Sequence, residues 1–216
     1  MPSCATRERS KLSPRPKVWY IADLHFGDER NMVYRGYDEI DQHDEDIFNA
    51  IVERVAPGDE LWVLGDISRG NSAGTKHALN MLMELKWFSK MHMKSPIQLH
   101  LIPGNHERCH PKNHDSHKHQ KLALTVFDSV QPFARHKIDG QDVMLSHFPY
   151  TRDRHETRYK QYRLFDEGLP LIHGHLHTED RLVDREIQVS WEAWHRPVEQ
   201  SEISSLIQEM DLPDVE

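Results

Sequence analysis

The chain has 216 residues, of which 37% are hydrophobic and 29% charged, a composition typical of a globular domain with a sizeable core. Its formal net charge of −8 argues against a protein that coats nucleic acid or an anionic membrane through charge alone. Cys4 and Cys109 are its only cysteines, so no disulfide framework is indicated and a reducing, cytoplasmic compartment is expected. No apolar run is long enough to span a membrane.

The two ends of the chain differ from its body. Residues 1–16 are polar and basic and lack the apolar segment of a secretory signal, so they predict a flexible leader. Residues 17–210 contain no repeat and no clear linker, and we interpret them as a single domain. Residues 211–216 form a short tail.

The first half of the chain alternates predicted strands and helices. Strands are expected at Lys17 to Ala22, Glu60 to Leu64 and Ile97 to Ile102. Apolar residues at helical spacing predict helices from about Asp44 to Val55 and from about Thr75 to Met91. This order predicts parallel strands joined by right-handed crossovers.

The second half has a different pattern. Val130 to Ile138 and Gln141 to Leu145 flank Asp139-Gly140, which predicts an antiparallel hairpin. The remaining elements are short strands at Leu169 to His173, Arg181 to Val183 and Ile187 to Trp191, and a helix from Ser201. An α/β fold of mixed sheets with helices outside is the simplest architecture for this order.

One long segment, Glu107 to His119, has no predicted element and is rich in histidine. The composition is typical of a solvated polar loop. A lid or an additional weak metal site is the alternative interpretation.

Five short apolar runs each lead into side chains that bind metals. Such runs are typical of strands buried on both faces. The residues that follow them are Asp23 and His25; Asp66; Asn105 and His106; His147; and His175 and His177. Ligands gather beyond the carboxyl ends of strands in layered α/β folds, so one shared site is predicted. Imidazole and carboxylate groups without cysteine favour Mn²⁺, Fe or Zn²⁺.

The order of these motifs, D-x-H, G-D, G-N-H-E, a single His and G-H-x-H, resembles the calcineurin-like metallophosphoesterase superfamily. The resemblance extends from Val18 to about Leu206, and the segments Ile21 to Gly27 and Trp191 to Val198 look like small prokaryotic and phage members. It implies a four-layer α-β-β-α sandwich of two mixed sheets, with a dimetal site at the carboxyl ends of the strands. Asp28 departs from the pattern, because many relatives have His there.

The resemblance also implies a ligand set for two divalent ions. The first metal would be held by Asp23, His25, Asp66 and His177, and the second by Asp66, Asn105, His147 and His175, with Asp66 as the bridge. Mn²⁺ is the expected ion, with Fe, Zn²⁺, Ni²⁺ and Co²⁺ as alternatives. A hydroxide between the metals would attack phosphorus.

His106 is expected to be catalytic and not a ligand. By resemblance it faces the phosphate and protonates or hydrogen-bonds the leaving oxygen, a role that suits the ordinary pKa of histidine. Glu107 would either orient His106 or be a solvated loop carboxylate. His173 is interpreted as a strand-end histidine.

Contacts to substrate are expected from a few polar side chains near these motifs. The candidates are Asn31, Arg69, Arg152, Arg154 and Arg158. The last three belong to a basic, aromatic stretch from Tyr150 to Arg163, for which an exposed charged helix or loop is the alternative interpretation.

The predicted activity is a metal-dependent phosphodiesterase for small substrates such as nucleotides or 2′,3′-cyclic nucleotides. A phosphomonoesterase, including a protein phosphatase, is the main alternative. A nuclease is disfavoured by the net charge, and a non-catalytic scaffold is disfavoured because all seven expected ligands are present. No membrane partner and no stable nucleic-acid complex are expected, and the oligomeric state stays open.

Overall fold

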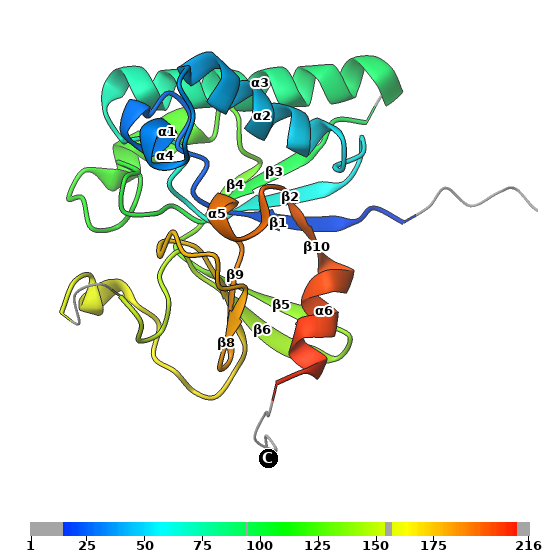
Figure 1. The fold of residues 1–216 in the computed structure, drawn as a ribbon, viewed down its shortest axis with the longest axis vertical. Helices are drawn as coiled ribbons and strands as arrows, with labels where there is room; N and C mark the ends of the chain where they lie inside the picture. Colours follow the sequence, from blue (N-terminus) through cyan, green and yellow to red (C-terminus); the bar gives the residue numbers. More distant parts are fainter. Residues whose placement is uncertain (1–14, 94, 154–156, 211–216) are drawn as a thin grey trace, which may run out of the picture.

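The computed structural model describes residues 15–93, 95–153 and 157–210. Ten strands within these residues form two five-stranded sheets. The first sheet has the order β10-β1-β2-β3-β4 and the second β5-β6-β7-β9-β8 (Figure 1). Both sheets are mixed, since β10 runs antiparallel to β1, and β5 and β8 run antiparallel to their neighbours.

The strands of the first sheet are β1 (Val18–Ile21), β2 (Glu60–Val63), β3 (Gln98–Leu101), β4 (Ser129–Val130) and β10 (Val198–Glu199). Those of the second are β5 (Ala134–Ile138), β6 (Gln141–Leu145), β7 (Leu171–His173), β8 (Leu182–Val183) and β9 (Glu186–Gln188). The helices are α1 (Glu29–Tyr34), α2 (Ile40–Val52), α3 (Ser72–Met93), α4 (Ser116–Ala123), α5 (Trp191–Trp194) and α6 (Gln200–Gln208), with a 3₁₀ turn at Lys160–Tyr162.

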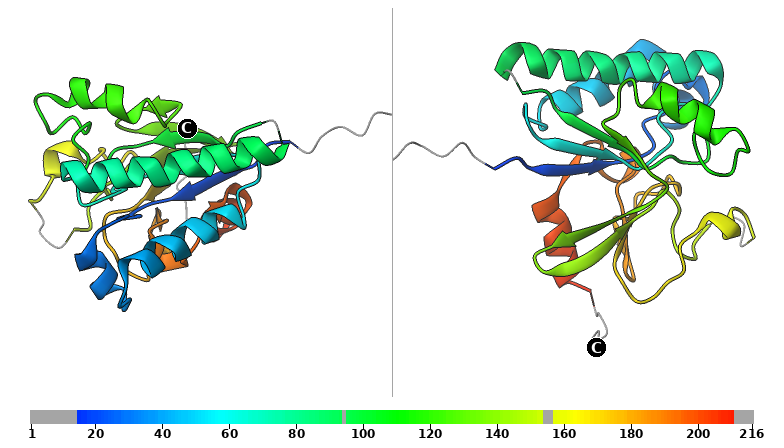
Figure 2. Two further views of the ribbon diagram at one scale, coloured as in Figure 1. Left: turned by 90° about the horizontal axis from the view of Figure 1, so that it is seen from above. Right: turned by 180° about the vertical axis from the view of Figure 1, so that it is seen from behind.

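Alternating side chains of the first sheet enter two separate cores. Trp19 and Ile21 of β1 pack with α2 and α3, which lie side by side over the outer face of this sheet (Figure 2). Tyr20 and Ala22 face the second sheet, where a second core also receives side chains of α5 and α6. The predicted α/β sandwich of two mixed sheets flanked by helices is confirmed.

The strand expected before the β5–β6 turn differs from the sequence prediction. Val130 to Ile138 is not one strand: β4 pairs with β3 in the first sheet, and β5 pairs with β6 in the second. Pro132 separates them, because proline cannot donate to a strand ladder. The expected hairpin turn at Asp139-Gly140 is present, with both residues at positive φ.

Two helices and strand β9 also differ from the sequence prediction. The expected loop at Glu107 to His119 ends in α4, whose Ala123 packs into the outer core. The helix expected from Asp44 begins at Ile40 and buries His43 in polar contacts that apolar periodicity does not reveal. The strand expected to reach Trp191 ends at Gln188, and Trp191 opens α5. Within the described residues, no helix is long and apolar enough to cross a membrane.

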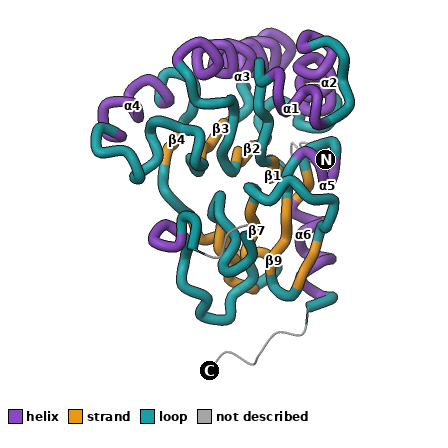
Figure 3. Tube along the Cα trace, turned by 60° about the vertical axis from the view of Figure 1, so that its left-hand side comes forward, coloured by secondary structure: helices purple, strands orange, loops and turns teal. Residues whose placement is uncertain are grey.

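Parallel strands set the place of the site. β1, β2 and β3 run parallel in the first sheet, and β6, β7 and β9 run parallel in the second. The loops that follow these strands face one another at one edge of the sandwich (Figure 3). Ala22 links the sheets there, since its N–H donates to Val189 O at 2.9 Å and its carbonyl accepts from Trp191 N at 3.1 Å.

Candidate metal centre

Two groups of metal-binding side chains lie at this edge. Asp23, His25 and His177 form the first, and Asp66, His147 and His175 form the second. The ligand atoms within each group lie within 4.8 Å of one another. Each group takes residues from loops of both sheets. In the first group, Asp23 and His177 are 154 positions apart in the chain, so only the fold brings them together.

Asp66 belongs to the second group but also faces the first. Its Oδ2 is 3.4 Å from His147 Nε2 in its own group and 4.0 Å from His25 Nε2 in the other. Burial alone would raise the pKa of Asp66, but the hydrogen bond and charge of His147 hold it well below its usual range. Asn105 adjoins the second group, with Oδ1 3.2 Å from His147 Nε2. All seven predicted ligands therefore lie together.

The backbone takes an unusual shape at this site. Five of the seven residues have a left-handed backbone, which L-residues rarely adopt and which costs roughly 1–3 kcal/mol at each position. They are Asp23 (φ 57°), His25 (φ 50°), Asp66 (φ 53°), His175 (φ 76°) and His177 (φ 52°). Such strain persists only where the surroundings enforce it, which is typical of functional sites.

Glycine provides the space that this arrangement requires. A Cβ atom on Gly104 would lie 2.3 Å from Asp66 Oδ1 and 2.7 Å from His147 Cε1. A Cβ atom on Gly174 would lie 2.6 Å from Asp23 Oδ2. The G-N-H and G-H-x-H motifs thus need glycine because the strand ends approach each other too closely for any side chain.

His106 stands at the rim of the centre. Its side chain is 36% exposed, and its Nδ1 donates to Arg69 O at 2.9 Å. Its Nε2 therefore faces the centre, 3.9 Å from Asp66 Oδ2. The neighbouring Glu107 neither orients His106 nor reaches solvent, which corrects both sequence expectations.

Glu107 instead connects the loop that carries Asp66 to the loop that carries Gly104. Its buried carboxylate accepts from Asp66 N at 2.8 Å, Ile67 N at 2.9 Å and Gly104 N at 2.6 Å. Burial and the charge of Asp66 raise the pKa of Glu107 to about 7, while these donors favour the charged form. Glu107 thereby fixes the G-D loop against the G-N-H loop.

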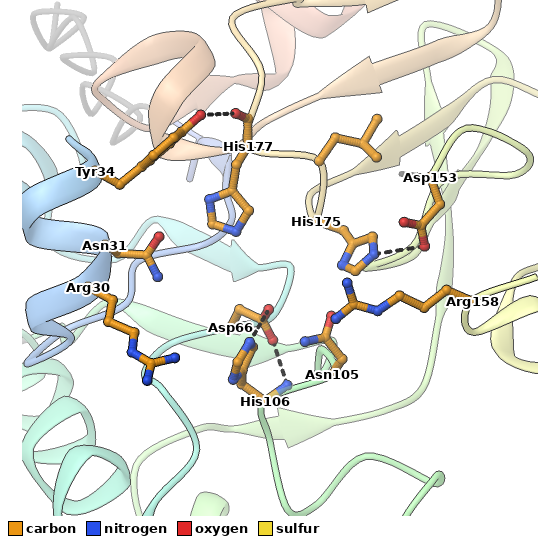
Figure 4. A pocket seen from close by; sticks show the side chains of 11 residues that line it. Arg30, Asn31, Tyr34, Asp66, Asn105, His106, Asp153, Arg158, His175 and His177 are labelled. Atoms are coloured by element: carbon orange, nitrogen blue, oxygen red, sulfur yellow. Dashed lines mark hydrogen bonds and ion pairs between the residues drawn. The ribbon is translucent and has the colours of Figure 1, made fainter. Parts of the chain in front are cut away.

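A pocket of about 300 Å³ opens above the centre. It is lined by Arg30, Asn31, Tyr34, Asp66, Asn105, His106, Asp153, Arg158, His175, Leu176 and His177 (Figure 4). Of the expected substrate contacts, Asn31 and Arg158 line this pocket. Arg69 does not, although its carbonyl holds His106, and Arg152 is engaged elsewhere by Glu186 at 3.0 Å. Arg154 lies outside the described residues.

Comparison with known proteins identifies the family to which the chain belongs. The profile of the calcineurin-like phosphoesterases matches residues 16–199. The chain belongs to this family. It is 37% identical to the Gene 66 protein of Mycobacterium phage L5 over 203 residues, 88% of this chain and 93% of the relative. It is 34% identical to the Gene 66 protein of Mycobacterium phage D29 over 206 residues, 90% of this chain and 97% of the relative.

A solved structure agrees with the fold. A protein of unknown function from Aquifex aeolicus superposes with a TM-score of 0.65 and 22% identity, covering 89% of this chain and all of that chain. The calcineurin-like phosphoesterase family implies hydrolysis of phosphoric esters with the help of metal ions, and the two ligand groups are where this chain could hold them.

The donor set of this family member fits such ions. Within the described residues, Asp23 Oδ1 and His25 Nε2 are buried without a hydrogen-bond partner. Buried polar atoms of this kind are costly to leave unpaired, and a bound ion would satisfy both. Imidazole and carboxylate atoms are suitable ligands for Mn²⁺, Fe or Zn²⁺.

A second set of contacts orients the histidines, as is usual around protein metal sites. His147 Nδ1 donates to Leu64 O at 2.8 Å, which leaves its Nε2 for the centre. His25 Nδ1 lies 3.2 Å from Asp28, His175 Nε2 lies 3.1 Å from Asp153, and His177 Nδ1 lies 2.8 Å from Glu192.

Sequence reasoning missed most of these outer residues. Asp28 stands out in the sequence only as a departure from the first motif, whereas Asp153 and Glu192 are far in the chain from the histidines that they contact and only the fold brings them near. One signal was available for α1, which also carries Arg30 and Tyr34. Asp28 is its N-cap and accepts from Arg30 N at 3.1 Å, a position where aspartate is strongly favoured.

Proposed function

We propose that this chain is a two-metal phosphodiesterase acting on small nucleotides, including 2′,3′-cyclic nucleotides. The observation that carries the proposal is the position of Asp66, which belongs to one ligand group, faces His25 of the other, and lines one pocket together with His106. Mn²⁺ is the preferred ion in the proposal. When bound, two such ions would neutralise phosphate charge and activate water at neutral pH.

The charge of the pocket suits a phosphate. The positive charge of two divalent ions would exceed the negative charge of Asp23 and Asp66. Asn105 would add a ligand without adding negative charge. Arg30 and Arg158 line the pocket from opposite walls (Figure 4). Within the described residues, neither guanidinium has an ion-pair partner, so both are available to an anion.

Each of these side chains has a distinct task in the proposed reaction. Arg30, Arg158 and Asn31 bind phosphate oxygens and orient the ester. His106, fixed through Arg69 O, presents Nε2 to the leaving oxygen and donates its proton there. Because the ring is partly exposed, it can then regain a proton from water.

A compact diester fits this pocket better than a large substrate. The exposed ring of Tyr34 and the side chain of Leu176 provide apolar surface beside the centre, suited to a nucleobase or aryl group. Phosphomonoesters are the main alternative, because the same metals and arginines would also bind a dianion. A nuclease is disfavoured by the net charge of −8.

Rates on matched pairs of substrates test the proposal. With Mn²⁺, kcat/KM should be higher for bis(p-nitrophenyl) phosphate than for p-nitrophenyl phosphate, and higher for a 2′,3′-cyclic nucleotide than for the corresponding monophosphate. Asp66→Asn protein purified in parallel controls for contaminating hydrolases. Faster hydrolysis of both monoesters would identify a phosphomonoesterase instead.

A further inference from the structure

We infer that Arg35 is a positioning residue that assembles the first ligand group, by joining the Asp23-Leu24-His25 turn to His177 through Glu192. The inference rests on the proposed two-metal function and extends it to a residue outside every motif. Arg35 follows α1 directly, and its side chain is only 3% exposed.

The guanidinium of Arg35 makes hydrogen bonds in three directions. It donates through Nη2 to Asp23 O and through Nη1 to Leu24 O at 3.0 Å. Its Nε donates to Glu192 Oε1 at 2.9 Å. The planar fork of arginine presents these donors on three separate nitrogens, whereas lysine has a single ammonium nitrogen.

Two of these partners, Asp23 and Glu192, bear directly on the first ligand group. Asp23 has the strained left-handed backbone, and a hydrogen bond to its carbonyl holds that conformation. Glu192 Oε1 lies 2.8 Å from His177 Nδ1. His177 therefore donates through Nδ1, and its Nε2 faces Asp23 Oδ1 at 3.8 Å, inside the first group.

A contact with His43 of α2 fixes the position of Arg35. Its Nη1 lies 2.8 Å from His43 Nε2, which must accept because arginine only donates. His43 consequently donates through Nδ1 to Asp44, whose carboxylate also accepts from Gly27 N. This buried chain connects α2 to the turn that carries His25, so the guanidinium is held in place before any ligand binds.

The two ligand groups depend on Arg35 unequally. Its hydrogen-bond partners within the described part of the chain do not include any member of the second group, which is oriented by Leu64 O and Asp153 instead. Loss of Arg35 should therefore weaken the first group and spare the second. A general structural role would instead weaken both.

Binding of Mn²⁺ to metal-free protein tests this, with free Mn²⁺ measured by electron paramagnetic resonance. Wild type should bind two ions. Arg35→Met should bind one ion with wild-type affinity and the other at least ~10-fold more weakly, the usual effect of losing an outer contact of a metal site. Combining Arg35→Met with His147→Ala should weaken both ions, whereas combining it with His177→Ala should still leave one bound normally.

Arg196→Met is the matched control. Arg196 makes a two-pronged pair with Glu202, at 2.6 and 2.9 Å, away from the pocket, so both affinities should stay at wild-type values. If Arg35→Met does not fold, Glu192→Gln, which preserves side-chain volume, replaces it in the same two affinity measurements, and the same unequal loss is expected. Two unchanged affinities in the folded variant would overturn the inference. Fewer than two ions on wild type would instead refute the proposed function.

Discussion

Asp66 connects the two ligand groups at the scale of single residues. Its carboxylate lies 3.4 Å from His147 Nε2 and 4.0 Å from His25 Nε2, and its Oδ1 accepts from His106 N at 2.8 Å. One side chain thus faces both groups and the proposed acid. The surrounding residues are arranged around this carboxylate, including Glu107, which holds its backbone N–H.

Asp66→Asn should abolish phosphodiester hydrolysis and reduce bound metal to one ion or none per chain, because the amide lacks the charge that both groups share. Metal content of the purified variant, together with its rate on bis(p-nitrophenyl) phosphate, checks this. Two tightly bound ions with a near-normal rate would show that Asp66 is not the bridge.

His106→Ala should keep both ions yet slow the reaction by roughly 10²–10⁴-fold, the usual contribution of general acid catalysis. The loss should be much smaller for an aryl diester than for a cyclic nucleotide, because p-nitrophenolate needs little protonation on leaving. The measurement is the wild-type to variant rate ratio for each substrate. Equal ratios would indicate that His106 binds phosphate oxygens, and a lost ion would make it a ligand.

The loops after the strands determine the geometry at the scale of elements. The loops after β2 and β3 meet at Gly65 and Gly104, where the Cβ of a residue at 65 would lie 2.5 Å from Gly104 N. The three acceptor contacts of Glu107 hold these loops together. Such close backbone contact leaves little freedom for the ligands that the loops carry.

Gly104→Ala should displace Asp66 and His147, since the new methyl group would overlap both. We expect destabilisation of about 1–3 kcal/mol, typical of overpacking, and a rate loss of about 10²-fold or more. Thermal melts and rates measure the two effects. Gly140→Ala is the control: it lies in the β5–β6 turn with no atom within 4 Å of its Cβ position, so it should lower stability through its positive φ but leave the rate intact.

The amino-acid sequence predicts the structure best where an apolar run ends at a metal-binding side chain. The ends of β1, β2, β3, β6 and β7 were predictable because each buried run stops at a metal-binding side chain. The division of residues 129–138 between two sheets was not, because strand pairing depends on tertiary contacts. Likewise Arg35 and Glu192 are 157 positions apart and carry no motif, so only the fold reveals their contact.

At the scale of the whole molecule, the centre joins the two sheets. The first group takes Asp23 and His25 from the end of β1 and His177 from the loop after β7. Ala22 and Ser190 bridge the sheets directly beside it. The ligands of each group come together only in the folded chain, so metal ions would bind only the folded state. Their binding should therefore raise the stability of the whole domain.

Removal of metal should therefore lower Tm. An ion at about 100 times its Kd adds about 2.7 kcal/mol, and about 1 kcal/mol shifts the Tm of a chain of this size by about 2–4 °C. EDTA should lower Tm by roughly 5–10 °C for each ion that it removes. Mn²⁺ should restore both Tm and activity at least as well as Mg²⁺, because imidazole ligands favour softer ions. Full rescue by Mg²⁺ alone would contradict the proposed ligand set.

Stepwise addition of Mn²⁺ to metal-free protein, while hydrolysis of bis(p-nitrophenyl) phosphate is followed, tests the two-metal centre most directly. Because Asp66 belongs to one ligand group and also faces the other, little activity is expected with the first equivalent. The rate should rise with the second equivalent and level off at two ions per chain. Full activity with one ion, or with none, would contradict a two-metal centre.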